Sequence, residues 1–184
     1  MNMTKIDTRA LCKMALCAAI LCVASYISFP LPFTPVIVSG QTLAVNLLAL
    51  ILSPAQAGAT VAVYILLGLI GLPVFAGGGS GIGSLIGPYS GYIYGFLAAA
   101  VLISLLKGQK PNLVRWLTVT IGVGIPVIDL GGMASLMLVN KMTVGGAFLA
   151  GAVPFFIGDI FKCVVACLAA VALEKAMKRV PAAG

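Results

Sequence analysis

Three ionisable residues interrupt long apolar stretches of the sequence: Asp129, Asp159 and Lys162. Asp159 and Lys162 are three positions apart, which on a helix places them on neighbouring parts of one face, with a rise of about 4.5 Å between them. A carboxylate beside an ammonium group offers an acceptor and a donor, and together they fit a neutral group that carries both N–H and C=O, such as a urea or an amide. The pair is therefore the first candidate for a ligand-binding site.

A second interpretation gives the same charges a purely structural role. A charge at the centre of a bilayer costs at least about 2.5–3.5 kcal/mol, so such residues usually face a cavity or one another. Lys162 would then neutralise Asp159 or Asp129 and hold two helices together. The sequence favours ligand binding for the Asp159–Lys162 pair and the structural role for Asp129.

The composition around these charges is that of an integral membrane protein. Of 184 residues, 61% are hydrophobic and only 8% are charged, whereas a soluble domain carries about 25% charged residues. A helix needs roughly 20 apolar residues to cross a bilayer. We therefore expect an all-α fold of six transmembrane helices, forming a single membrane domain over residues 1–184.

Six apolar segments are predicted to form these helices, with turn-like segments rich in Gly and Pro between them. The fifth segment is either one long helix or two pieces, because Pro126 and the pair Gly131 and Gly132 interrupt it. In the sixth, a helix that starts near Gly151 places Asp159 roughly 12 Å below the outer surface. The predicted segments are 11–27, 42–52, 58–70, 91–106, 113–139 and 147–173.

The basic residues predict how these helices are oriented. Lysine and arginine near the ends of spans tend to stay in the cytoplasm. Placing both termini inside puts Lys141 outside, together with a Gly-rich external loop at 71–90, and leaves nearly all other basic residues in the cytoplasm. The net charge of +7 is thereby explained by topology, and no basic stripe interleaved with aromatics indicates nucleic-acid binding. The cytoplasmic set is Lys5, Arg9, Lys13, Lys107, Lys110, Arg115, Lys175, Lys178 and Arg179.

Several kinds of chemistry find no support in the sequence. Histidine does not occur, which removes the commonest general base and the commonest metal ligand. The five cysteines form no CxxC pair, so no metal site is expected. The glycines of the 71–90 loop are not followed by GKS or GKT, so this is no phosphate-binding loop. It is either a flexible loop or a lid whose backbone approaches a ligand closely. We expect neither an enzyme nor a bound cofactor.

Three runs of sequence resemble one known family: QTLAVNLLALILSPAQAG, YILLGLIGLPVFAGGGSGIGSLIGPYSGYIYGF and PFFIGDIFKCVVA. They are similar to BioY, the biotin-specific S component of energy-coupling factor (ECF) vitamin transporters. The resemblance extends from about Ala15 to Lys175, and the LPVFAGG to GP..GY..GF block is its most specific part. It implies the ECF S-component fold, in the cell membrane, with capture of biotin from outside.

The same resemblance implies a set of ligand-binding residues. The DxxK pair that the family uses for its ligand falls on Asp159 and Lys162, and the ureido ring of biotin is a urea, as the pair requires. Phe75 and the glycines that follow it would cover the bicyclic ring, with two further candidates on other segments. The remaining implied contacts are Gln41, Phe75, Gly77, Gly78 and Tyr92.

A second implied site concerns partner subunits. Ala15 and Ala19 have the AxxxA spacing that lets helices approach closely in lipid, although the same spacing is ordinary in an alanine-rich helix. In the family such a patch docks the S component on a transmembrane T subunit, which couples to two ATPase subunits. That division of labour would explain why this chain has no phosphate loop.

Departures from the family pattern keep other hypotheses open. Tyr89 and Ser90 stand where Thr and Gly are usual, and Asn46 adds a polar group to the second predicted helix. The alternatives are an S component for a different small vitamin, an autonomous carrier, an intramembrane enzyme that uses Asp129 and Asp159 as a carboxylate pair, and a subunit in which the charges only pair with one another.

Overall fold

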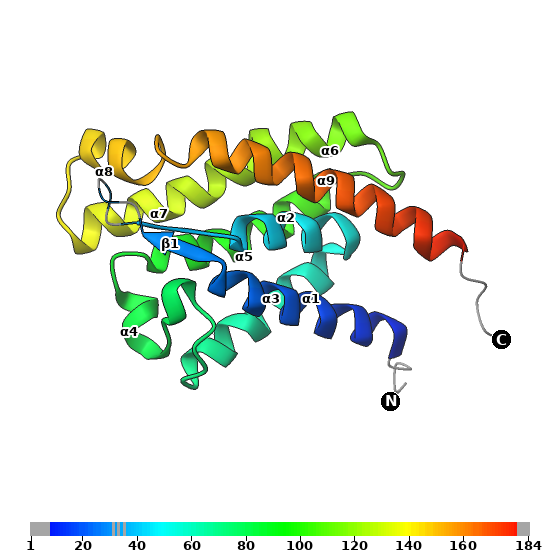
Figure 1. Cartoon of the computed structure of the whole chain (residues 1–184), viewed down its shortest axis with the longest axis horizontal. Coiled ribbons are helices and arrows are strands. Elements are labelled where there is room, and N and C mark those ends of the chain that lie inside the picture. The colour runs from blue at the N-terminus through cyan, green and yellow to red at the C-terminus, as the bar shows by residue number, and fades with distance from the viewer. Residues whose placement is uncertain (1–7, 31, 33, 35, 180–184) are drawn as a thin grey trace.

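The apolar segments of the sequence form long helices that pack side by side in an elongated bundle (Figure 1). The computed structural model describes residues 8–30, 32, 34 and 36–179. Each predicted segment overlaps one of the main helices. Their ends agree with the predicted ones to within six residues, except that the last helix begins at Phe156 and not at 147. These helices are α1 (Thr8–Tyr26), α2 (Gln41–Ile51), α3 (Pro54–Leu69), α5 (Ser90–Leu106), α6 (Leu113–Val119) continued by α7 (Ile125–Val139), and α9 (Phe156–Arg179).

Three of the helical stretches are long and apolar enough to cross a bilayer: Thr8–Tyr26, Leu113–Val139 and Phe156–Met177. The other apolar helices, α2, α3 and α5, are shorter, with 11, 16 and 17 residues. Eleven residues of helix extend only about 16 Å, which is less than a hydrocarbon core of roughly 30 Å. The number of six complete spans therefore stays a prediction, while a predominantly helical architecture with helices suited to a membrane is confirmed.

The two ends of the bundle differ in what they contain. One end of the bundle in Figure 1 contains the start of α1, the end of α9 and the connection between α5 and α6. The other end contains the β-hairpin, α4 and α8. The hairpin pairs β1 (Ser28–Pro30) antiparallel with β2 (Ile37–Ser39). The segment between α3 and α5 contains a single 3-10 turn, η1 (Ala76–Gly78), and the short helix α4 (Gly81–Ile86). The 71–90 segment is thus partly helical and not one continuous loop.

The fifth segment is one continuous helical stretch. It passes through Gly131 and Gly132 without a break. A turn of π-helix over Thr120–Gly124 comes just before Pro126. Proline cannot donate to the helical ladder, and its ring would clash with the carbonyl four residues earlier. The wider π turn accommodates it, so the proline alters the helix locally and does not divide it.

The sixth segment, predicted as one helix, is broken. Helix α8 (Val144–Gly151) is followed by a turn at 152–155 that contains Pro154, and α9 starts at Phe156. The residue before a proline is disfavoured in the helical conformation, which explains the break. Asp159 consequently lies in the first turn of α9. The helix start near Gly151, on which the predicted depth below the outer surface depended, is wrong.

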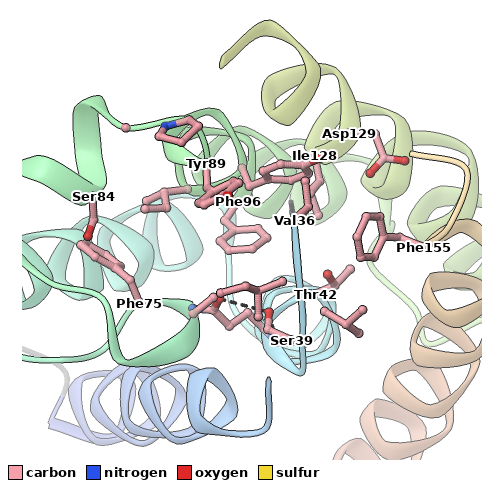
Figure 2. A pocket seen from close by; sticks show the side chains of 18 of the residues that line it. Val36, Ser39, Thr42, Phe75, Ser84, Tyr89, Phe96, Ile128, Asp129 and Phe155 are labelled. Atoms are coloured by element: carbon pink, nitrogen blue, oxygen red, sulfur yellow. Dashed lines mark hydrogen bonds between the residues drawn. The ribbon is translucent and has the colours of Figure 1, made fainter. Parts of the chain in front are cut away.

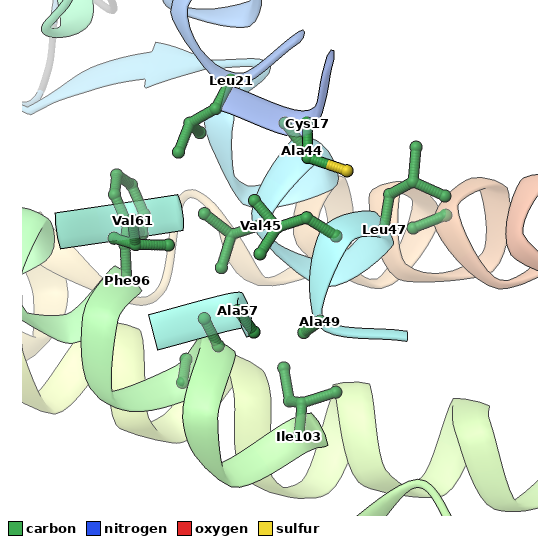
Figure 3. Packing of buried hydrophobic residues seen from close by; sticks show 14 of the residues in the cluster. Cys17, Leu21, Ala44, Val45, Leu47, Ala49, Ala57, Val61, Phe96 and Ile103 are labelled. Atoms are coloured by element: carbon green, nitrogen blue, oxygen red, sulfur yellow. The ribbon is translucent and has the colours of Figure 1, made fainter. Parts of the chain in front are cut away.

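The core is centred on α2, which contacts α1, α5 and α9. Figure 3 shows apolar side chains of four helices meeting there, among them Leu21 of α1, Val45 of α2, Val61 of α3 and Ile103 of α5. All four are completely buried. The short helix α2 is thereby enclosed by longer helices. Contacts with these helices keep its eleven residues in place, although α2 is too short to cross a bilayer.

Helices α5 and α7 approach so closely that no side chain fits between them at one point. A Cβ atom at Gly91 would overlap the carbonyl oxygen of Gly131, and one at Gly131 would overlap the carbonyl of Gly91. Lipid tails are as apolar as leucine, so close van der Waals packing of small residues is a main source of helix association in a membrane. These two glycines hold α5 and α7 together.

Replacing Gly91 by Ala should therefore destabilise the fold by about 1–3 kcal/mol through overpacking. The matched control is Gly145→Ala in α8, where an added Cβ meets nothing within 4 Å. Thermal unfolding of both purified variants in detergent measures the difference. Equal melting temperatures for the two variants would show that the α5–α7 contact relaxes without cost.

Candidate functional site

A cavity of about 280 Å³ lies at the end of the bundle that contains the hairpin and α4. This volume is close to the lower end of the range of about 300–1,000 Å³ that is usual for small-molecule sites. Figure 2 shows Phe75 and Ser84 at one end of the cavity and Asp129 and Phe155 at the other, with Phe96 between them. Its lining comes from β2, α2, α5, α7, α9 and the segment between α3 and α5.

The predicted pair, Asp159 and Lys162, lies in the wall of this cavity. The Lys162 ammonium donates to Asp159 Oδ1 at 3.0 Å, and Asp159 is 5% exposed. Asp159 is close to the start of α9, where backbone N–H groups favour a negative charge. The ion pair is thus buried but borders the cavity.

Gln41 also lines the cavity, but its amide is already engaged by the protein. Its Oε1 accepts from Ser39 Oγ at 3.1 Å, and its Nε2 donates to the Tyr64 hydroxyl. Tyr64 belongs to α3, is completely buried and does not line the cavity. Gln41 is therefore held rigidly at the start of α2 by a residue behind the site.

Phe75, predicted to contact the ligand, lines the cavity, and Tyr64 also fixes its position. The two rings meet edge to face, with centroids 5.5 Å apart. The Phe75 ring occupies the space that a side chain at Gly68 would need. Gly77 and Gly78, predicted to contact the ligand, do not line the cavity. Both have positive φ and make the tight turn that returns the chain behind Phe75.

Tyr92 joins two sides of the site. Its ring lines the cavity and lies where a side chain at Gly132 would be, and its hydroxyl donates to the Gly151 carbonyl at 2.8 Å. The hydroxyl therefore ties α5 to the last residue of α8. Tyr92 therefore contributes mainly its apolar ring to the cavity wall, because the hydroxyl already has a partner.

Several cavity residues were not predicted from the sequence. Asp129 was assigned a structural role, yet it lines the cavity. The apolar walls come partly from β2, within a segment that the sequence presented only as a turn-like run rich in proline. Phe155, directly after Pro154, could have been found from the PFFIGD run that it shares with Asp159. The unpredicted lining includes Val36, Val38, Thr42, Phe96, Ile128 and Phe155.

Asn46, one turn beyond Thr42 on α2, lies within the core next to the site. Its Nδ2 donates to the Thr42 carbonyl and to Cys163 Sγ. Cys163 belongs to α9 and follows Lys162 directly in the sequence. The polar group that departs from the family pattern therefore links α2 to α9 at the level of the ion pair.

The predicted docking residues lie on the outside of the molecule. Ala15 and Ala19 are exposed on α1, next to the exposed side chains of Leu16 and Val23. None of them contributes to the cavity. The structure thus separates the two predicted sites, one enclosed at the hairpin end and one on the surface of α1.

Comparison with known proteins gives a consistent result. The sequence model described as the BioY family matches residues 1–179. A relative from Thermotoga maritima named biotin transporter BioY is 37% identical over 91% of this chain and 96% of its own length. Biotin transporter BioY2 of Lactococcus lactis subsp. cremoris is 34% identical over 91% of each chain.

The fold has a counterpart among solved structures. The crystal structure described as the S-component for biotin from an ECF-type ABC transporter superposes with a TM-score of 0.85. It covers 95% of both chains at 24% sequence identity. The similarity confirms the expected S-component fold.

The hydrogen bond between Tyr64 and Gln41 is expected to stabilise the fold as a coupled pair. Tyr64→Phe and Gln41→Leu each leave a buried polar group unpaired and should each cost about 1–3 kcal/mol. The double variant removes both partners, so its loss should be smaller than the sum by about 1 kcal/mol. Thermal unfolding of the four proteins measures this, with half-exposed Tyr94→Phe as the control tyrosine. Additive losses would contradict the coupling.

Proposed function

Because this chain belongs to the BioY family, we propose that it is the substrate-binding S component of an ECF-type transporter and that it captures biotin. The observation that carries the proposal is the buried Asp159–Lys162 ion pair in the wall of a largely apolar cavity. The names of its relatives support transport over catalysis, since they are called biotin transporters.

The cavity suits the two chemically different parts of biotin. The ureido group offers N–H to the Asp159 carboxylate and C=O to the Lys162 ammonium. Charge-assisted hydrogen bonds of this kind are about twice as strong as neutral ones. The sulfur-containing ring and the aliphatic chain would lie against apolar walls, to which Phe75, Phe96 and the Tyr92 ring contribute.

The distribution of charge supports binding from outside. Arg9 and Lys13 on α1, Lys107 after α5 and Lys175 on α9 belong to the end of the bundle that lies away from the cavity. Lys141 follows α7 at the cavity end. Basic residues favour the cytoplasmic side, so the cavity and the 71–90 segment face outward. Lys5, which entered the same prediction, lies outside the described residues.

The exposed face of α1 supports an assembly with other subunits. Ala15 and Ala19 form a strip of small exposed side chains one turn apart, with exposed Leu16 and Val23 beside it, and small residues allow a partner helix to approach closely. We place the T subunit of the transporter on this strip, with two ATPase subunits supplying the energy. Binding and energy supply are then carried by different chains.

The proposal predicts that the ion pair determines affinity for biotin. Asp159→Asn and Lys162→Met should each weaken biotin binding by about 2–5 kcal/mol, because each leaves a desolvated partner behind. Glu174→Gln and Lys175→Met, near the other end of the same helix, are the matched controls. Isothermal titration calorimetry on purified, monodisperse protein provides the measurement. Wild-type affinity in both Asp159→Asn and Lys162→Met would rule out the assigned site.

A second prediction separates docking from binding. Ala19→Trp should greatly reduce biotin uptake by cells that also produce the T and ATPase subunits, because the bulky ring blocks helix approach. Calorimetry on the same variant should give wild-type affinity, since α1 does not line the cavity. Leu105→Trp, at an exposed position on α5, controls for the added bulk. Normal uptake with Ala19→Trp would place the T subunit elsewhere.

A further inference from the structure

Asp129 differs from the other buried polar side chains around the cavity. It is 8% exposed, lies on α7 and lines the cavity. No hydrogen bond or ion pair links its carboxylate to any residue that the structure describes. An unpaired carboxylate in an apolar environment is costly, so a group from outside the protein is the natural partner.

The ion pair with Lys162 that would give Asp129 a structural role does not form. The Lys162 ammonium bonds to Asp159, and the Tyr92 hydroxyl donates to Gly151. Both Lys162 and Tyr92 line the same cavity, yet each has its partner elsewhere. Asp129 therefore does not hold two helices together through either of these groups.

We propose that Asp129 is a specificity-determining residue that accepts a hydrogen bond from the ligand and selects a urea over a simple amide. The inference rests on the proposed function and refines its site. Asp159 and Lys162 supply one acceptor and one donor, and Asp129 adds a second acceptor from a different helix. The matching ligand group has a carbonyl flanked by two N–H donors. A urea satisfies all three protein groups, whereas an amide leaves one carboxylate unpaired.

The same arrangement fixes the direction of the ligand's acidic tail. Asp129 and Phe155 lie at one end of the view in Figure 2, and Phe75 and Ser84 lie at the other. An anionic tail beside Asp129 would place two negative charges together in a low-dielectric site, which is strongly unfavourable. The tail therefore extends toward the Phe75 and Ser84 end, and the ureido ring stays with the carboxylates.

The test uses biotin and two isosteric lactam analogues, in each of which CH₂ replaces one ureido N–H. Calorimetry is done with purified wild type, Asp129→Asn, Asp159→Asn and the control Glu174→Gln. Wild type should bind each lactam about 10- to 100-fold more weakly than biotin, the effect of losing one hydrogen bond to a charged group. Asp129→Asn should show a similar loss for biotin, and Glu174→Gln should show none.

The decisive result is how the variants and the analogues combine. For the lactam that lacks the N–H facing Asp129, Asp129→Asn should cause no further loss of affinity. For the other lactam, the same substitution should weaken binding as much as it does for biotin. Asp159→Asn should show the reverse preference. A purely structural role for Asp129 would weaken all three ligands equally and would overturn the proposal.

Failure of the inference and failure of the proposed function give different results. Unchanged biotin affinity in Asp129→Asn, with tight binding by wild type, overturns only the role of Asp129. No binding of biotin by wild type overturns both. If Asp129→Asn does not fold, the wild-type measurements still decide, because unchanged affinity for either lactam would show that only one N–H is recognised.

Discussion

The interior of this bundle is largely apolar, so a buried polar side chain is costly unless it finds a partner within the protein or in a ligand. The Asp159–Lys162 ion pair meets that requirement across one turn of α9. The Gln41 amide meets it through Tyr64, on another helix. The bond between Gln41 and Tyr64 holds α2 against α3, because separating these helices would leave a polar group unpaired in an apolar medium.

The same constraint explains how the molecule combines a rigid frame with an accessible site. Side chains that line the cavity are held by residues behind it, as Tyr64 holds Phe75 and Gln41. A frame of this kind keeps binding groups in place before the ligand arrives, which reduces the entropy lost on binding. Asp129, whose carboxylate has no partner among the described residues, is the position at which we propose that a ligand completes the set of hydrogen bonds.

Close packing drives the association of these helices in lipid, as hydrophobic burial drives association in water. In lipid, helices gain little from removing apolar surface, and contact depends on small residues that let backbones approach. Gly91 and Gly131 provide this between α5 and α7. Exposed Ala15 and Ala19 on α1 offer the same kind of surface to a second protein. One physical rule thus accounts for an internal contact and for the proposed docking face.

The sequence by itself determined the membrane class and the approximate positions of the main helices, and it identified Asp159 and Lys162 as the candidate binding pair. Length, hydropathy and the cost of a buried charge are local properties, so they can be read along the chain. The positions of Gly77 and Gly78 outside the cavity, and that of Asp129 within it, depended on how separate segments meet in space.

Only the tertiary structure decided which polar groups were already satisfied. A sequence shows that Gln41, Tyr92 and Asp129 are polar. It does not show that the first two are bonded to Tyr64 and Gly151, or that the third has no bond to a residue within the described part of the chain. Those partners are 23 and 59 residues away along the chain, and their pairing follows from helix packing. The Asp159–Lys162 pair could be predicted from the sequence because the two residues are one helical turn apart.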